Sequence, residues 1–301
     1  MRTAIVSGAN GFVGNATVRE LLSNGYRVQG LVHSSATDIC EHPHLKTIGF
    51  SLENVQSVMD ELEPSESFYH FAWNGSSGSA RSDSTLQLNN VKWTIDALKL
   101  AKAVGCKRFI CAGSLSEYEA FATLHEDCVR PGTGYIYGGA KLAAHIMCKC
   151  IASDIGIDLL WGVITNAYGP GEISKRLINT TLRKIINGET PRFTSATQNY
   201  DFVYIDDVAR AFRLIGERGI PFSEYVIGSS DAKPLRDYLD EINHTVAKNM
   251  DFTYGDIPSA GADLPIGIFD TKKIEEDTGF TAEVPFGEGI MHTYEWLKKQ
   301  T

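Results

Sequence analysis

The sequence predicts an α/β fold built on a doubly wound parallel sheet, with enough length for a smaller second lobe. Two observations predict the sheet. Short apolar runs alternate along the chain with stretches whose apolar residues recur at helical intervals. The first apolar run also ends in closely spaced glycines that open a helix, as in parallel sheets that bind a ligand at their carboxyl edge. Since no internal repeat or low-complexity linker is visible, any two lobes are expected to interleave.

The composition is that of an ordinary globular protein, and it excludes several partners. A formal net charge of −9 argues against nucleic acid or an anionic membrane as the main partner, because both repel an acidic surface. The six cysteines form no C-x-x-C pair, and neither a secretory signal nor a run of about 18 apolar residues occurs, so we expect a reduced, cytoplasmic setting. The eight histidines lack metal-ligand spacing, and we expect no metal.

The first strand, Ala4–Val6, is followed by Gly8, Gly11 and Gly14 and by a helix expected from Val13 to Leu22. The first glycine allows a backbone conformation closed to other residues, the second leaves room for a pyrophosphate, and the third lets helix and strand pack closely. Free N–H groups and the positive end of the helix dipole then face the phosphates. The sequence therefore predicts a dinucleotide site formed by Gly8, Asn10, Gly11, Phe12, Val13 and Gly14.

The second strand, Arg27–Val32, indicates which dinucleotide binds. An acidic residue at its end would accept hydrogen bonds from the adenosine ribose and repel a 2′-phosphate, but Val32 occupies that position. His33, Ser34 and Ser35 could instead donate to a phosphate. NADP(H) is therefore favoured, and NAD(H) remains possible because no arginine in this turn secures the phosphate.

A third strand is expected at Leu45–Phe50, followed by a helix near residues 52–62. Ser51 and Leu52 lie at the junction between them. Because the junction follows the carboxyl end of a parallel strand, we expect both residues beside the adenine of the cofactor.

The fourth strand, Phe68–Trp73, leads into a loop rich in glycine and serine, residues 74–79. Ala72 and Trp73 end the strand on the cofactor side. The loop is long enough to line a substrate pocket over the nicotinamide. Trp73 is either a wall of that pocket or a core aromatic.

A helix at Thr85–Val104 presents an apolar face, with the polar Asn90 on or near it. The fifth strand, Phe109–Gly113, follows and delivers Ser114 at its carboxyl end. In open parallel sheets that edge is where ligands bind. Ser114 is therefore a candidate site residue.

Tyr137 and Lys141 lie four residues apart at the start of the next helix, hence on one face. A free phenol has a pKa near ~10 and is a poor acid or base at neutral pH. An ammonium one turn away stabilises the phenolate and brings proton transfer into the working range. Ser114 can then hydrogen-bond the substrate oxygen that Tyr137 protonates or deprotonates.

These motifs resemble those of extended short-chain dehydrogenases/reductases, the group that contains nucleotide-sugar epimerases, dehydratases and ketoreductases. The resemblance covers nearly the whole chain and involves several motifs in the order found in that family. They are Gly8-x-x-Gly11-x-x-Gly14, Asn90-Val91, Ser114 four residues before Tyr118, Tyr137-x-x-x-Lys141, Asn166-Ala-Tyr-Gly-Pro-Gly171 and Asp201-Phe-Val-Tyr-Ile-Asp-Asp-Val208.

The resemblance implies a Rossmann-type dinucleotide domain of residues 1–166 and about 201–230. Residues 167–200 and about 231–301 would form a smaller α+β substrate lobe interleaved with it. The resemblance further implies a homodimer through the two helices that carry Asn90 and Tyr137.

The resemblance also implies roles for individual residues. Ser114, Tyr137 and Lys141 would be catalytic, with Tyr137 and Lys141 also contacting the cofactor and Lys141 holding the nicotinamide ribose. Asn90 would contact the cofactor as well, and Asn166 would lie near the diphosphate of the substrate.

A basic helix expected at Ile173–Asn187 contains Arg176, which either opposes a nucleotide diphosphate or belongs to a solvated face. Tyr200 stands where the family commonly has an arginine before Asp-Phe-Val, so one usual phosphate contact is absent. The substrate residues expected on these grounds are Ser116, Asn166, Arg176 and Tyr200.

Two departures from family patterns narrow the reaction. Dehydratases of the family carry an Asp-Glu pair after the catalytic hydroxyl, where this chain has Leu115 and Ser116, so elimination of water lacks its acid and base. Fucose-synthase-type epimerising reductases have a Cys at the position of Ser116 and a His at that of Gly171, which argues against epimerisation at C3 or C5.

The sequence therefore predicts an NAD(P)-dependent nucleotide-sugar oxidoreductase, most simply a 4-ketoreductase that uses NADPH. The alternative enzyme is a C4 epimerase with a retained NAD. A non-catalytic protein that senses the dinucleotide is the alternative of another class, although such proteins usually lose the tyrosine and lysine that this chain keeps.

Overall fold

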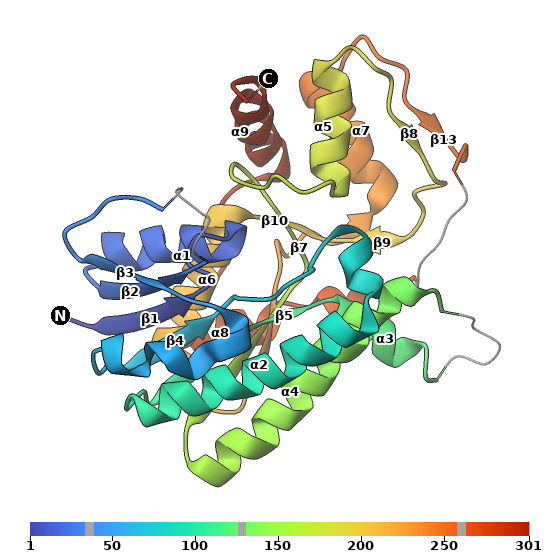
Figure 1. The fold of residues 1–301 in the computed structure, drawn as a ribbon. Helices are drawn as coiled ribbons and strands as arrows, with labels where there is room; N and C mark the ends of the chain where they lie inside the picture. The colour runs from blue at the N-terminus through green and yellow to red at the C-terminus, as the bar shows by residue number, and fades with distance from the viewer. Residues whose placement is uncertain (34–38, 126–130, 258–262, 301) are drawn as a thin grey trace.

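The computed structural model describes residues 1–33, 39–125, 131–257 and 263–300, and its centre is a seven-stranded sheet (Figure 1). The strands lie in the order β11-β6-β5-β4-β1-β2-β3, and all neighbours are parallel. Their bounds are β1 Thr3–Ser7, β2 Arg27–Val32, β3 Leu45–Gly49, β4 Ser67–His70, β5 Arg108–Ser114, β6 Asp158–Ile164 and β11 Glu224–Ile227. This is the predicted doubly wound sheet, and strand succession reverses between β1 and β4.

Helices bury both faces of the sheet (Figure 1). Successive residues of β1 point to opposite faces, so Ala4 and Val6 join one core and Ile5 joins the other. Burial on both sides explains why β1, β5 and β6 are nearly continuous apolar runs. One face is covered by α1 (Phe12–Ser23) and α6 (Ile205–Arg218), the other by α2 (Ser84–Ala103) and α4 (Ile136–Ile155).

Short elements complete the edge of the sheet domain. The 3₁₀ segments are η1 (Leu52–Glu61), η2 (Gly78–Ser82), η3 (Thr133–Tyr135) and η4 (Ile266–Phe269). The remaining helices here are α3 (Ser116–Ala122) and α8 (Lys272–Thr278). Although α8 falls within residues 231–301, it packs on α6 and β11 of the sheet domain.

The second group of elements lies beyond the carboxyl ends of the strands, at the top of Figure 1. Its helices are α5 (Leu177–Ile186), α7 (Leu235–Val246) and α9 (Phe286–Lys298). Its two-stranded sheets pair β7 (Asn166–Tyr168) with β10 (Phe202–Tyr204), β9 (Asn199–Tyr200) with β12 (Lys233–Pro234), and β8 (Arg192–Phe193) with β13 (Thr253–Tyr254). The chain enters and leaves this group more than once, as interleaving requires.

Two predicted helices differ from the structure. The helix expected near 52–62 is a 3₁₀ segment interrupted at Asn54, whose φ of −136° and ψ of 61° are not helical. The basic helix expected from Ile173 begins only at Leu177, because Arg176 has extended backbone angles. None of the described helices is long and apolar enough to cross a bilayer.

Candidate active site

The turns after β1 and β4 meet at the point where strand succession reverses. Gly8 has a φ of +68°, and a Cβ there would lie 2.8 Å from the backbone nitrogen of Ala72. A Cβ at Gly14 would lie 2.1 Å from the carbonyl oxygen of Gly8. Both positions therefore require glycine for the strands and α1 to approach this closely. Gly11 is exposed and would place its Cβ 3.2 Å from the same oxygen.

The amino end of α1 is suited to a phosphate. Gly11 caps the helix without any side-chain hydrogen bond, and the first turn contains no acidic residue. The backbone N–H groups of this turn therefore remain available, and the helix dipole adds partial positive charge. Both features favour the diphosphate of a dinucleotide at this position.

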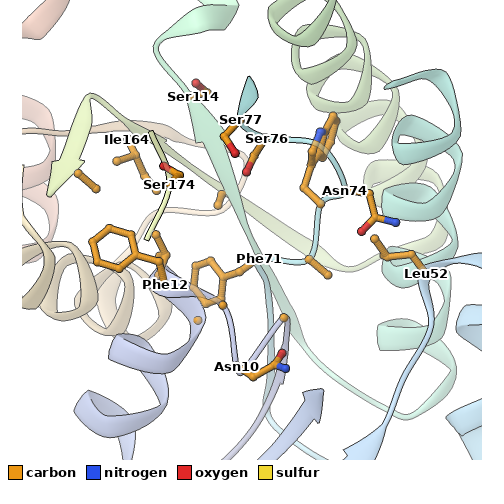
Figure 2. Close-up of a pocket in the computed structure, with 18 of the residues that line it drawn as sticks. Asn10, Phe12, Leu52, Phe71, Asn74, Ser76, Ser77, Ser114, Ile164 and Ser174 are labelled. Carbon is orange, nitrogen blue, oxygen red and sulfur yellow. The ribbon is translucent and has the colours of Figure 1, made fainter. Parts of the chain in front are cut away.

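A cavity of about 490 Å³ opens above this turn. In Figure 2 Asn10 lies at one end of the cavity, and the hydroxyl groups of Ser76, Ser77 and Ser114 gather at the other. The volume lies within the usual range for sites that bind small molecules and cofactors. Predicted cofactor residues that line it are Gly8, Asn10, Gly11, Phe12, Val13, Gly14, His33, Ser51, Leu52, Ala72, Trp73, Tyr137 and Lys141.

Glu53, beside Ser51 and Leu52, adds a carboxyl group to the described residues that line the adenosine end of the cavity. His33 lines it after β2, and the Asn10 side-chain amide donates to the His33 carbonyl oxygen at 3.5 Å. The side chain of Ser51 accepts a hydrogen bond from the Glu53 backbone and lies beside Leu52. Ser34, the other predicted phosphate donor, falls outside the described residues.

Asn90 was predicted to contact the cofactor, but the structure places its side chain elsewhere. Its side chain is 1% exposed, accepts from the Asn74 backbone N–H at 2.9 Å and donates to the carbonyl oxygens of Asn74 and Leu86. It does not line the cofactor cavity. Because Asn74 does line the cavity, Asn90 acts on the site by holding the loop after β4.

The three predicted catalytic residues come together from two elements. Ser114 ends β5, while Tyr137 and Lys141 share one face of α4, and all three line the cofactor cavity. Lys141 is 5% exposed, and its Nζ donates to the Ala112 carbonyl oxygen at 2.9 Å. The same Nζ lies 3.8 Å from the centroid of the Trp73 ring.

Trp73 is a wall of the cavity and also packs against the core. Its ring meets that of Tyr137 edge-on at 5.9 Å, and its Nε1 donates to Gln87 at 2.8 Å. Both predicted roles for this side chain therefore apply. The indole of Trp73 therefore packs against both the Tyr137 ring and the Lys141 ammonium.

A second cavity, of about 260 Å³, shares five lining residues with the first: Ser114, Thr165, Ala167, Glu172 and Arg176. The two spaces therefore meet at Ser114, the predicted catalytic serine. The four predicted substrate residues, Ser116, Asn166, Arg176 and Tyr200, all line this second cavity.

Two of these predicted substrate residues make polar contacts within the protein. Asn166 donates to the Asp201 carbonyl oxygen at 3.1 Å, and Arg176 lies 3.8 Å from the Glu172 carboxylate. Burial raises the pKa of the Tyr200 phenol, and the negative charge of Glu119 adds to the effect. Tyr200, which stands where the family commonly has a phosphate-binding arginine, therefore lines this cavity as a neutral phenol.

Arg81 is a site residue that the sequence analysis missed. It lines the second cavity, its guanidinium lies 4.1 Å from the centroid of the Tyr137 ring, and its Nη2 donates to the Ser116 hydroxyl at 3.0 Å. Burial lowers the pKa of the guanidinium from its ordinary value. The one available signal was position, because Arg81 stands two residues after the loop predicted to line the substrate pocket.

No motif in the sequence indicated the polar cluster that the structure places next to Ser114. The Glu117 carboxylate accepts from the Ser114 backbone N–H at 2.9 Å and from the Trp161 indole at 3.1 Å. His145 Nδ1 lies 3.2 Å from Glu117 and 3.3 Å from Glu224. These three potential metal ligands lie within 4.8 Å of one another, but hydrogen bonds inside the protein already engage each of them.

The sheet order, the glycine turn and the tyrosine–lysine pair beside it define an extended short-chain dehydrogenase/reductase. The model of the NAD dependent epimerase/dehydratase family matches residues 4–228, and the chain belongs to that family. It is thus an NAD-dependent enzyme of the epimerase/dehydratase type, and the resemblance seen in the sequence is confirmed.

Individual relatives are distant in sequence, but each match covers nearly the whole of this chain. The chain is 25% identical over 319 residues to GDP-mannose 3,5-epimerase 1 of Oryza sativa subsp. indica, covering 98% of this chain and 81% of that protein. It is 24% identical over 321 residues to UDP-glucose 4-epimerase of Mycolicibacterium smegmatis, covering 100% of both. The structure of UDP-glucose 4-epimerase with UDP-glucose from Thermotoga maritima superposes with a TM-score of 0.83, at 22% identity and 99% coverage of both chains.

Proposed function

We propose that this protein is a nucleotide-sugar 4-epimerase that retains NAD. The observation that carries the proposal is the junction of the two cavities. Ser114 lines both the cavity proposed for the dinucleotide and the cavity proposed for the substrate. Tyr137 and Lys141 line the first of these cavities together with it. A sugar in the second cavity would therefore present one carbon to the cofactor and that carbon's oxygen to Tyr137.

The cavity fits a dinucleotide on grounds that belong to this chain. Glycines at positions 8 and 14 bring the turn and α1 against the strands, and the uncapped amino end of α1 faces the opening. Gly8, Gly11 and Gly14 all line the cavity, and none of these three positions places a side chain against the phosphates. Trp73 and Lys141 bound the opposite end, where a nicotinamide ribose would lie.

Tyr137 takes the proton from the C4 hydroxyl of the sugar and later returns it to the same oxygen. Ser114 donates a hydrogen bond that holds this oxygen in place while a carbonyl exists at C4. Lys141 holds the phenol and the ribose on one side of the site. NAD, when bound, would supply the hydride-accepting and hydride-donating chemistry that the reaction at C4 requires. Inversion follows if the sugar turns over between the two transfers.

The choice among reactions rests on the relatives and on two positions. The family and the named relatives favour an epimerase or a dehydratase over the NADPH-consuming ketoreductase that the sequence indicated. Leu115 and Ser116 stand where the dehydratases place their acid and base, which disfavours elimination. A C4 epimerase needs no further acid or base than the tyrosine.

Retention of NAD is part of the proposal. The family description names NAD, and an epimerase that returns its hydrogen has no need of a renewable reductant such as NADPH. The predicted preference for NADP rested partly on Ser34 and Ser35, which the structure does not describe. The homodimer through α2 and α4 remains a prediction.

Turnover distinguishes the alternatives. Purified protein is expected to release bound NAD on denaturation and to interconvert a C4-epimeric pair such as UDP-glucose and UDP-galactose without net change in absorbance at 340 nm. Stoichiometric loss of NADPH with a 4-keto sugar would establish the ketoreductase instead. Tight binding of NAD without conversion of any nucleotide sugar would support the non-catalytic alternative.

Tyr137→Phe tests the catalytic assignment. Because general acid–base catalysis typically contributes 10²- to 10⁴-fold, we expect kcat to fall by about 10³-fold while bound NAD is retained. Tyr294→Phe on α9 is the matched control and should leave kcat unchanged. A Tyr137→Phe enzyme with full kcat would contradict the proposed mechanism.

A further inference from the structure

Arg81 brings a positive charge to the reacting end of the substrate cavity. Its guanidinium lies 4.1 Å from the Tyr137 ring centroid, and its Nη2 donates to the Ser116 hydroxyl at 3.0 Å. Its Nη1 donates to the Ser76 carbonyl oxygen at 3.3 Å. Two of the five N–H donors of the guanidinium are thus used, and the others remain for a ligand.

The charge of Arg81 is not neutralised by the protein. Across the described parts of the chain, no carboxylate forms an ion pair with it. Glu119 lines the same cavity and attracts Arg81 only at longer range, while Arg176 repels it. The nearest interaction of the charge is with the Tyr137 ring, which carries no formal charge. A partly buried cation without an anionic partner is costly, so its retention indicates an anion that arrives with the ligand.

The rest of the loop holds Arg81 in this position. Gln87 on α2 is completely buried, and its side-chain amide donates to the carbonyl oxygens of Gly75 and Ala80 at 3.0 and 2.9 Å. Gly75 has a φ of +72°, and a Cβ there would lie 2.8 Å from the Ala80 side chain. The loop is thus anchored at two points in the six residues before the arginine, and the cation is placed before the ligand binds.

The position of Arg81 separates it from the diphosphate. Arg176 lines both cavities and faces the Glu172 carboxylate, as expected for a residue between cofactor and nucleotide. Arg81 lines only the second cavity and lies beside Ser116 and Tyr137. An anion bound there would be a substituent of the sugar itself.

We propose that the substrate is a nucleotide sugar whose sugar carries a carboxylate, and that Arg81 binds this carboxylate. This inference rests on the proposed function, since it assumes a nucleotide sugar in the second cavity. A guanidinium suits a planar carboxylate because two parallel N–H groups can donate to its two oxygens. The carboxylate could be that of a uronic acid or of an ether-linked acid such as the lactyl group of muramic acid.

The first experiment measures binding and conversion in matched pairs. Each pair joins a neutral sugar to its uronate on one nucleotide, in the UDP, dTDP and GDP series, so that the nucleotide contribution cancels. UDP-N-acetylglucosamine and UDP-N-acetylmuramate form a further pair, which separates the two sources of carboxylate. We expect the acidic member of at least one pair to bind at least 30-fold more tightly by calorimetry, with a matching gain in kcat/KM.

Arg81→Gln should abolish that preference. For the acidic sugar we expect KM to rise about 30-fold with little change in kcat. The ratio of kcat/KM for the acidic member to kcat/KM for the neutral member of the pair should fall by about the same factor. Arg81→Lys should recover part of the loss, because it restores charge without the planar fork. Arg27→Gln, an exposed position at the amino end of β2, is the control and should change nothing.

Two results would overturn the inference in different ways. If neutral sugars are preferred, or if Arg81→Gln lowers kcat equally for both members of a pair, then Arg81 serves Tyr137 and not a carboxylate, and the epimerase proposal stands. If no nucleotide sugar of any series binds to the NAD-loaded protein, both proposals fail together.

Discussion

The two ends of the site are built in different ways. At the cofactor end, backbone touches backbone: a Cβ at Gly14 would come within 2.1 Å of the Gly8 carbonyl oxygen, and one at Gly8 within 2.8 Å of the Ala72 nitrogen. At the substrate end, side chains from separate elements touch one another, as when Arg81 meets Ser116 and Tyr137. The first end is specific for a shape shared by all dinucleotides, while the second can change substrate by changing a few side chains.

Mutations at the two ends should therefore have different effects. A change at the cofactor end should damage the fold and cofactor binding together, because the same contacts support both. A change at the substrate end should alter kinetics or preference while the sheet persists. Arg81 and the variants below test this division.

The largest effect is expected for Gly14→Ala at the cofactor end. The added methyl group would overlap the Gly8 carbonyl, so α1 must move away from β1, at a cost of more than about 3 kcal/mol. We expect loss of bound NAD and a clearly lower Tm, measured on purified protein by release of the dinucleotide and by thermal unfolding.

Gly139→Ala in α4 is the matched control for that change. No heavy atom lies within 4 Å of a Cβ built at this position, so alanine should stabilise the helix by about 0.5–1 kcal/mol. Bound NAD should be unchanged. Wild-type NAD content and Tm in Gly14→Ala would show that close backbone contact does not define the cofactor end.

A smaller effect is expected for Glu117→Leu behind the substrate end. The variant leaves the Ser114 backbone N–H and the Trp161 indole without an acceptor, at a cost of about 2–3 kcal/mol in the free energy of unfolding. Because Ser114 then loses a fixed position, kcat should fall about 10-fold with little change in KM.

Glu117→Gln separates positioning from packing. The amide oxygen can still accept from Ser114 and Trp161, so kcat should return to within about threefold of wild type. If the glutamine variant is as slow as the leucine variant, the charge that faces His145 matters and not the acceptor for Ser114.

The smallest effect is a pH dependence of stability caused by His70, the last residue of β4. Burial, aided by the positive charge of Lys141, lowers the pKa of His70 to about 3. In the unfolded chain a histidine titrates near ~6.5, so below that pH the unfolded chain binds a proton that the native protein does not. Stability is therefore complete above about pH 6.5 and falls as the pH drops, by about 2 kcal/mol at pH 5.

Denaturant unfolding at pH 7.5 and pH 5.0 measures this loss. His70→Asn should reduce the pH dependence by about 2 kcal/mol, whatever its stability at pH 7.5. His292→Asn, at an exposed position on α9, controls for the removal of one histidine. An unchanged pH dependence in His70→Asn would show that another group is responsible.

Much of the fold and of the cofactor end could be predicted because their signals are local. The second strand was predicted at its observed bounds, and the fifth within one residue at each end, because the buried interior of each strand is a local signal. The errors arose where backbone geometry departs from its usual pattern. Asn54 has non-helical backbone angles inside a helical segment, and the extended backbone of Arg176 makes α5 begin later than predicted. The spacing of apolar residues indicates neither feature.

The sequence by itself determined the sheet, the glycine turn and the pairing of Tyr137 with Lys141, since each depends on residues only a few positions apart. Tertiary structure alone decided that Asn90 holds a loop, that Glu117, His145 and Glu224 meet behind Ser114, and that Arg81 faces the substrate cavity. The reason is physical: local spacing fixes which face of an element a side chain occupies, but its partners depend on how distant elements pack.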